Sequence, residues 1–216
     1  MVKITYRPAN QTDAPFIARL MNLSSSGVIE FLFNELVPGI STERILSSIV
    51  RNKQSELSYE NVQVAVHNDS LVGIANYYPA TKHRITKEME EFFTKERLAI
   101  LQDWFDSRVD SSCFLNTLSV APEYHRQGIG SYLINFVKEK ASFQGFSSVS
   151  LIVLADNKNA IRLYHRQGFQ KSKHINIGFH PLLPHEDGAV LMNCPLYNPS
   201  ANLRGFNACR NRMNTS

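Results

Sequence analysis

The sequence has few cysteines and no long apolar run, and both absences narrow the classes of protein it can represent. Only three cysteines occur in 216 residues: Cys113, Cys194 and Cys209. Their odd number and wide spacing exclude a fully paired disulfide scaffold and match no zinc-ligand pattern, so we expect inert thiols and no metal. No stretch is apolar for the roughly 18 residues that a membrane span requires. Polar residues begin by Gln11, too early for a signal peptide, which favours a cytoplasmic protein.

A clustered basic stripe is also missing. The chain carries 23 Lys and Arg against 19 Asp and Glu, a net charge of +4, and the basic residues are scattered along it. A mild positive balance suits an anionic cofactor, whereas a nucleic-acid interface needs a concentrated patch. We therefore expect no nucleic-acid partner.

Hydrophobic periodicity predicts a mixed α/β fold in one domain. Strands are expected at 2–6, 62–66, 71–75, 114–120, 149–154, 169–179 and 189–196. Helices are expected at 28–36, 42–52, 128–142 and 158–167, after a first helix capped by Thr12, and one or two more helices are expected at 86–105.

The order of these elements predicts the sheet. Alternation of strand and helix in the centre implies a parallel pair around the 114–120 strand, and the hairpins imply antiparallel flanks. We expect a mostly antiparallel sheet with a central parallel pair flanked by helices. The domain is expected to span 1–197, with a helical insertion at about 86–105 and a polar tail at 198–216, where periodicity is absent.

The five-residue word YHRQG occurs twice, at 124–128 and 164–168, in two different settings. In the first copy, Gly128 and Gly130 stand where a predicted strand turns into a predicted helix. The first N–H groups of that helix have no internal partners and its dipole places positive charge there, so this turn predicts a phosphate-binding loop. In the second copy, Gly168 follows a helix and ends it. The repeat is therefore coincidental rather than a duplicated unit.

Two longer segments resemble motifs of the GNAT superfamily of acyl-CoA-dependent N-acetyltransferases. Residues 118–130, LSVAPEYHRQGIG, resemble the family's motif A, and residues 157–164, NKNAIRLY, with the Gly-Phe pair that follows, resemble its motif B. The segment 6–14 is similar to the family's first strand and helix. The resemblance covers roughly residues 3–196 and implies the GNAT fold.

The resemblance implies acetyl-CoA as co-substrate. Amides near 126–131 would bind the pyrophosphate. The backbone of Leu118 and Val120 would pair with the pantetheine arm as an added strand does, and the Val120 N–H would polarise the thioester carbonyl. His125 stands where the family usually has Gln or Arg, and Arg126 beside it offers a replacement. The residues implied to contact the cofactor are Leu118, Ser119, Val120, His125, Arg126, Gln127, Gly128, Ile129, Gly130, Ser131 and Asn157.

The resemblance also implies direct attack of a primary amine on the thioester in a ternary complex. The amine must be neutral to attack, although an alkylammonium has a pKa near 10.4, so a base or an ordered water chain is needed. Tyr164 occupies the position of the family's general acid; the alternative is a tyrosine that only packs in the core. The base stays open among Glu30, Glu35, His83, Glu123 and a water held by Ser119 or Asn116.

Two other functions use the same turn. A non-catalytic acyl-CoA sensor would bind the cofactor without releasing CoA, and a nucleotide-dependent regulator would bind ATP or NAD. The second fits less well, because residues 128–133 lack the third glycine of a dinucleotide turn and the Lys of a Walker A loop. The acceptor amine stays open, as does the oligomeric state, for which a homodimer is one candidate. Tyr77, Tyr78 and residues 31–33 either line an acceptor pocket or pack in the core, and the loop 180–187 is long enough for a lid.

Overall fold

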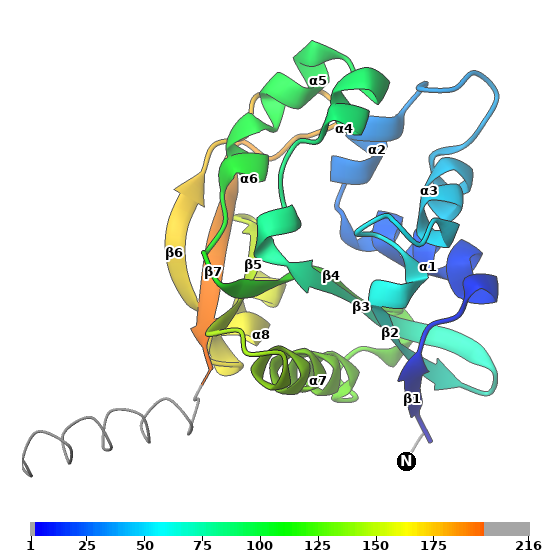
Figure 1. The fold of residues 1–216 in the computed structure, drawn as a ribbon, viewed down its shortest axis with the longest axis vertical. Helices are drawn as coiled ribbons and strands as arrows, with labels where there is room; N and C mark the ends of the chain where they lie inside the picture. Colours follow the sequence, from blue (N-terminus) through cyan, green and yellow to red (C-terminus); the bar gives the residue numbers. More distant parts are fainter. Residues whose placement is uncertain (1–2, 197–216) are drawn as a thin grey trace, which may run out of the picture.

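The computed structural model describes residues 3–196, which are built on one seven-stranded sheet (Figure 1). The strands are β1 (Thr5–Pro8), β2 (Val62–His67), β3 (Ser70–Pro79), β4 (Ser112–Val120), β5 (Ser148–Leu154), β6 (Gln170–Ile175) and β7 (Ala189–Pro195). They lie in the order β1-β2-β3-β4-β5-β7-β6. Strands β4 and β5 pair in parallel and the other neighbours pair antiparallel, which confirms the predicted sheet.

Helices cover both faces of the sheet. They are α1 (Ala14–Ser24), α2 (Val28–Phe33), α3 (Thr42–Arg51), α4 (Lys87–Phe92), α5 (Lys95–Ile100), α6 (Gln102–Asp106), α7 (Ile129–Phe143) and α8 (Lys158–Arg166). Short 3₁₀ turns lie at Gln11–Asp13, Tyr59–Asn61, Ala80–Lys82 and Pro122–Tyr124. In Figure 1, α7 and α8 lie below the sheet, while α1–α3 and α4–α6 lie above it.

The two faces have separate hydrophobic cores. Below the sheet, the buried stripe of α7, with Leu133 and Ile134, packs on Leu115 of β4 and on Val149 and Leu151 of β5. Above the sheet, α1 and α3 pack on β2 and β3. Because both faces are covered, the central strands are apolar along most of their length.

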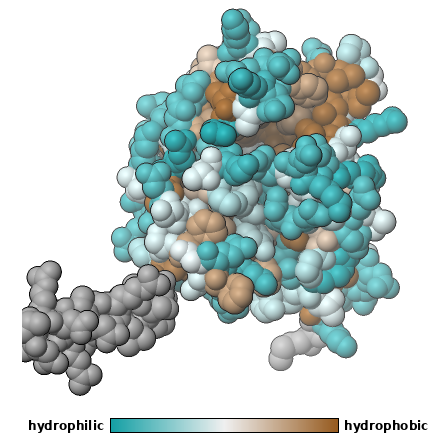
Figure 2. Space-filling view, viewed as in Figure 1, coloured by the Kyte–Doolittle hydropathy of each residue, from teal (hydrophilic) through white to brown (hydrophobic). Residues whose placement is uncertain are grey.

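Helix α2 belongs to a third cluster that it shares with α4–α6. Phe31, Leu32 and Phe33 are at most 6% exposed and pack with Phe93, Leu98 and Leu101. The core interpretation of residues 31–33 is therefore correct. Figure 2 shows an apolar hollow near the top of the visible surface of the molecule, below α4 and α5 and beside α2.

The start of the first helix differs from the prediction. The N-cap of α1 is Asp13, which makes no side-chain cap bond to the helix. Thr12 lies in the 3₁₀ turn before α1, and Asn10 caps that turn, since its side chain accepts a hydrogen bond from the Thr12 N–H at 2.9 Å. The Asp13 carboxylate accepts from the Asn10 N–H at 2.8 Å and completes a capping box. The same carboxylate pairs with the Arg7 guanidinium at 2.7 Å. The sequence prediction was wrong because Thr12 lies inside a short 3₁₀ turn that precedes α1.

Other element boundaries also differ from the prediction. The strand expected at 2–6 is β1, which extends to Pro8, and the helix expected at 28–36 ends at Phe33. The segment 86–105 forms three short helices rather than one or two, because Thr86 and Thr94 each cap a new helix. The strand expected at 169–179 ends at Ile175. The predicted tail at 198–216 lies outside the described residues.

Candidate active site

Strands β4 and β5 separate soon after they begin. They pair from Ser112 to Phe114 with Ser148 to Ser150, after which β4 continues along β3 to Val120 and β5 continues along β7 to Leu154. We call the gap between residues 115–120 of β4 and 151–154 of β5 the β4–β5 opening. An extended chain can add itself to a strand edge of this kind.

The backbone of β4 presents polar groups to this opening at two positions. Ala121 N–H donates to Val72 O at 2.8 Å, which marks a bonded pair of the β3–β4 ladder. Since bonded and non-bonded positions alternate along an antiparallel pair, Leu118 and Val120 direct their N–H and C=O groups away from β3. The Val120 carbonyl is occupied by the His125 ring, whose Nε2 lies 2.8 Å from it. The Val120 N–H and the N–H and C=O of Leu118 therefore stay available, among residues 3–196, to a chain that enters the opening.

Ser119 lies differently from its two neighbours. It is opposite Ile74 at a bonded position, so its backbone groups belong to the β3 ladder. Its side chain is 4% exposed. The backbone N–H and C=O groups of Leu118 and Val120 therefore face the opening, and those of Ser119 do not.

The turn after β4 ends in a helix without a side-chain cap. Gly128 is the N-cap of α7 with φ +83°, and Arg126 also has a positive φ of 61°. The first backbone bond of the helix runs from Tyr132 N–H to Gly128 O at 3.0 Å, so the N–H groups of residues 129–131 have no intrahelical partner. The positive end of this 15-residue helix adds to their attraction for anions. Of the residues on this turn that were predicted to contact the cofactor, 125–128 are exposed and Ile129 is buried.

Tyr164 lies on α8 in the core shared by α7 and β5. Its side chain is 8% exposed and its ring meets Phe169 edge-on at 5.7 Å. Burial raises the pKa of Tyr164 to about 12, so the phenol is protonated at neutral pH. Leu118 and Val120 pack against the same cluster. Asn157 caps α8, since its side-chain oxygen accepts from the Ala160 N–H at 3.1 Å.

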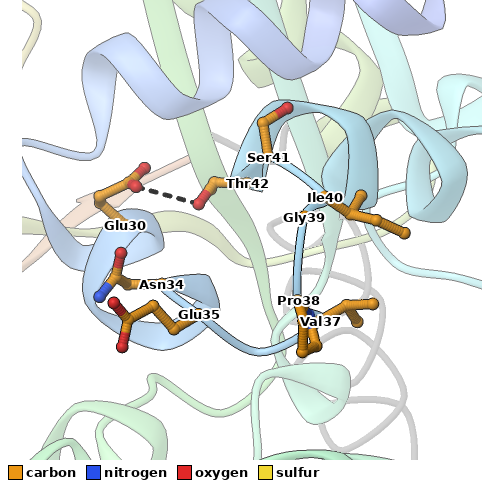
Figure 3. Close-up of a pocket in the computed structure, with 9 residues that line it drawn as sticks. All are labelled: Glu30, Asn34, Glu35, Val37, Pro38, Gly39, Ile40, Ser41 and Thr42. Carbon is orange, nitrogen blue, oxygen red and sulfur yellow. Dashed lines mark hydrogen bonds between the residues drawn. The ribbon is translucent and has the colours of Figure 1, made fainter.

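The candidate bases have different surroundings. Glu123 is exposed on the turn after β4. Glu30 accepts a hydrogen bond from the Thr42 hydroxyl at 3.0 Å, and with Glu35 it lines a pocket of about 480 Å³ (Figure 3). All lining residues of that pocket come from α2, α3 and the loop between them, and none lies on β4, β5 or α7.

His83 is buried at 3% exposure, and its ring stacks on Phe114 with centroids 4.1 Å apart. Burial lowers the pKa of His83 to about 4, against the opposing effect of its hydrogen bond to the Trp104 carbonyl. The imidazole is therefore neutral at pH 7. His83 belongs to a polar chain that includes Asn116 and Tyr78, and also Asn76. Sequence reasoning missed Asn76, because a single asparagine within a strand pattern carries no signal of its partner.

Metal binding and thiol chemistry find little support in the described residues. Among residues 3–196, no group of three His, Cys, Asp or Glu side chains could hold a metal ion. Burial raises the pKa of the Cys113 thiol to about 12, so it stays protonated. No helix of the described part of the chain is long and apolar enough to cross a bilayer.

This architecture, a mixed sheet that opens beside an uncapped helix N-terminus, has known relatives. The acetyltransferase (GNAT) family model matches residues 41–169. The [ribosomal protein bS18]-alanine N-acetyltransferase of Escherichia coli K12 is 30% identical over 88 residues, 41% of this chain and 58% of that protein. The thialysine N-epsilon-acetyltransferase of Bos taurus is 46% identical over 57 residues, 26% of this chain and 34% of that protein. This chain thus matches little more than half of the first relative's length.

Solved structures share the fold at low identity. An N-acetyltransferase from Staphylococcus aureus Mu50 superposes with a TM-score of 0.67 at 16% identity, over 88% of this chain and 99% of that one. The PaiA N-acetyltransferase of Thermoplasma acidophilum, in complex with coenzyme A, superposes with a TM-score of 0.52 at 14% identity, over 89% and 99%. Because the family model covers more than half of the chain, the protein belongs to the GNAT acetyltransferase family, which confirms the resemblance.

Proposed function

We propose that the protein transfers the acetyl group of acetyl-CoA to a primary amine. The observation that carries the proposal is the junction of two features: the β4–β5 opening and the uncapped N-terminus of α7, joined by the turn at 121–128. The opening offers the backbone N–H and C=O groups of β4 to an arm that carries amides. The α7 N-terminus offers free N–H groups to a phosphate. Coenzyme A carries both groups, and a family neighbour of the same fold binds it.

The cofactor would lie along these two features. The N–H groups of residues 129–131 would bind the pyrophosphate, with Arg126 and Gln127 exposed beside them. The backbone of Leu118 would pair with the pantetheine amides, and the Val120 N–H would point to the thioester carbonyl and stabilise charge that develops there. His125, which departs from the family pattern, would act indirectly by holding the Val120 carbonyl. Asn157 would combine capping with a contact to the cofactor through its Nδ2.

The transfer would proceed by direct attack. The lone pair of a neutral amine forms the C–N bond, the C–S bond breaks, and the departing thiolate takes a proton. Tyr164 is the proposed donor, because its phenol is protonated and its hydroxyl has no hydrogen-bond partner among residues 3–196. The proton lost by the amine leaves through a water chain or a base. We propose residues 1–197 as the catalytic domain.

The two curated relatives act on different primary amines, an alanine of a ribosomal protein and thialysine. The test therefore measures free-thiol release from acetyl-CoA with four acceptors: a peptide with an N-terminal alanine, thialysine, lysine and spermidine. We expect the wild type to release thiol with at least one of them.

Tyr164→Phe separates an enzyme from a sensor. The variant keeps the ring and its packing but loses the proton, so kcat should fall about a hundredfold, while coenzyme A affinity by calorimetry stays within twofold. A wild type that binds acetyl-CoA but releases thiol with none of the acceptors would favour the sensor, and one that does not bind it would overturn both.

A further inference from the structure

Four side chains form a hydrogen-bonded chain beside the β4–β5 opening, on the sheet face opposite α7. We call Asn76, Tyr78, His83 and Asn116 the Asn116 network. Asn116 is the extra residue of a β-bulge, since Thr117 lies opposite Asn76 and Leu115 lies opposite Tyr77. It follows closely after Phe114, the last β4 residue that pairs with β5, and it is half-buried.

The orientation of the Asn116 amide is fixed from the Asn76 side. Asn76 is fully buried and donates from Nδ2 to two carbonyls, Glu56 O at 3.1 Å and Asn61 O at 3.2 Å. Carbonyls only accept, so the Asn76 Oδ1 must face Asn116, whose Nδ2 donates to it at 3.0 Å. The second Asn116 N–H donates to the Thr117 hydroxyl at 3.2 Å. Both donors of Asn116 are therefore engaged, and its oxygen has one orientation.

Tyr78 and His83, at the other end of the network, determine how many hydrogen bonds Asn116 Oδ1 accepts. The Trp104 carbonyl lies 3.0 Å from His83 Nε2, so Nε2 carries the proton and the neutral ring leaves Nδ1 as an acceptor. The Tyr78 hydroxyl lies 3.1 Å from Asn116 Oδ1 and 3.5 Å from His83 Nδ1. One proton thus has two acceptors, and Asn116 Oδ1 keeps a lone pair that no described group fills.

We propose that Asn116 Oδ1 accepts an N–H of the incoming amine and that Tyr78 and His83 are positioning residues for it. The inference rests on the proposed function, because it requires an amine in front of the opening. An oxygen that holds one N–H turns the nitrogen lone pair away from itself, which orients the amine for attack. When the amine occupies the oxygen, the Tyr78 hydroxyl can donate to His83 Nδ1 instead, so the network accommodates the substrate without leaving a polar atom unpaired.

Two variants of Asn116 separate this role from a structural one. Asn116→Ala removes the oxygen, whereas Asn116→Asp keeps an oxygen in place. Both should lower the unfolding temperature, because Ala leaves Asn76 Oδ1 without its donor and Asp sets a carboxylate oxygen against it. Only Asn116→Ala should lower kcat/KM for the amine, by about tenfold to a hundredfold. The KM for acetyl-CoA and the Kd for coenzyme A should stay within twofold in both.

A second pair of variants removes a hydroxyl from each face of β3. Tyr78→Phe takes the donor away from Asn116 and should lower kcat/KM for the amine severalfold. Tyr77→Phe is the matched control, because Tyr77 packs on Phe136 of α7 on the other face, and it should leave all kinetic constants unchanged. The assay uses whichever of the four acceptors the wild type acetylates fastest.

The outcomes are distinguishable. Equal losses in Asn116→Ala and Asn116→Asp, or no loss in Asn116→Ala, would overturn the inference and leave the transferase intact. A rise in the KM for acetyl-CoA rather than the amine would also overturn it. A wild type that acetylates none of the four acceptors would remove the proposed function and this inference together.

Discussion

Two glycines of the α7 region offer a matched test of the phosphate-binding turn. Gly128 at the start of α7 and Gly145 just beyond its end both have φ +83°, and a Cβ added to either would meet nothing within 4 Å. Alanine at each position therefore experiences the same backbone strain without a clash. The left-handed conformation costs alanine about 1 kcal/mol, partly offset because alanine has less freedom than glycine in the unfolded chain.

The expected stability loss is the same for both variants. For a chain of this size, about 1 kcal/mol lowers the unfolding temperature by about 2–4 °C. Coenzyme A affinity should differ, because Gly128 directly precedes the free amides of residues 129–131, and a methyl group added there would stand close to the proposed position of the pyrophosphate. Weakening one charge-assisted hydrogen bond by about 1.4 kcal/mol lowers affinity about tenfold. Gly145→Ala should bind coenzyme A like the wild type.

Thermal unfolding and calorimetry with coenzyme A measure the two effects separately. If Gly128→Ala binds coenzyme A as tightly as Gly145→Ala, the pyrophosphate does not lie on this turn and the reasoning fails. Equal weakening in both variants would mean that affinity follows general stability, which would also refute it.

The loop between β6 and β7 gives two further predictions. His185 lies between the Asp156 carboxylate and the Ser26 carbonyl, each 2.7 Å from a different ring nitrogen. Burial lowers its pKa, but the two acceptors outweigh burial and raise it, so the stabilisation is full below pH about 6.5 and is lost as pH rises through the folded pKa. His185→Gln should thus lower the free energy of unfolding, measured with urea, by about 2 kcal/mol at pH 6 and by much less at pH 9. An equal loss at both pH values would contradict a stabilising role for the protonated His185 ring. Gly27→Ala should lower the free energy of unfolding by about 2–3 kcal/mol in the same assay, because Gly27 has φ +97° and an added Cβ would lie 2.8 Å from Leu182 O. An unchanged free energy would mean that the 180–187 loop shifts to make room for the methyl group.

The strand, turn and helix of the proposed cofactor side were predictable because they are contiguous in sequence. A strand, a glycine turn and a helix with an apolar stripe follow one another from 114 to 142, and each signal depends only on nearby residues. The two YHRQG copies were separated correctly on the same basis. Gly128 begins α7 and Gly168 follows the end of α8, both in the left-handed region.

The proposed acceptor side was not predictable in the same way. Asn76 and Asn116 are forty positions apart and meet only because β3 and β4 pair with a shifted register. Tyr78 meets Asn116 for the same reason, whereas His83 lies only five positions after Tyr78, beyond the 3₁₀ turn at Ala80–Lys82. The short helices α4–α6 also depend on context, since their buried or partly buried apolar residues pack in one cluster with α2, far away in the chain. Such contacts leave no local pattern in one sequence.

The bulge at Asn116 connects the two halves of the site. A bulge bends its own strand and increases the local twist, and here it lies just beyond the point where β4 parts from β5. Under the proposed function, the same irregularity would help to separate the strands for the extended arm of the cofactor and would place a side-chain oxygen at the edge of that opening. The segment FLNTLSV carries one trace of it: the polar pair Asn116-Thr117 stands between Leu115 and Leu118, which pack in the same core although they are three positions apart. The prediction of a regular strand at 114–120 does not use this break in the alternation. Deletion of Asn116 would remove the inserted residue, so it should both narrow the opening and abolish the proposed amine contact, which kcat/KM for the amine and the Kd for coenzyme A would measure.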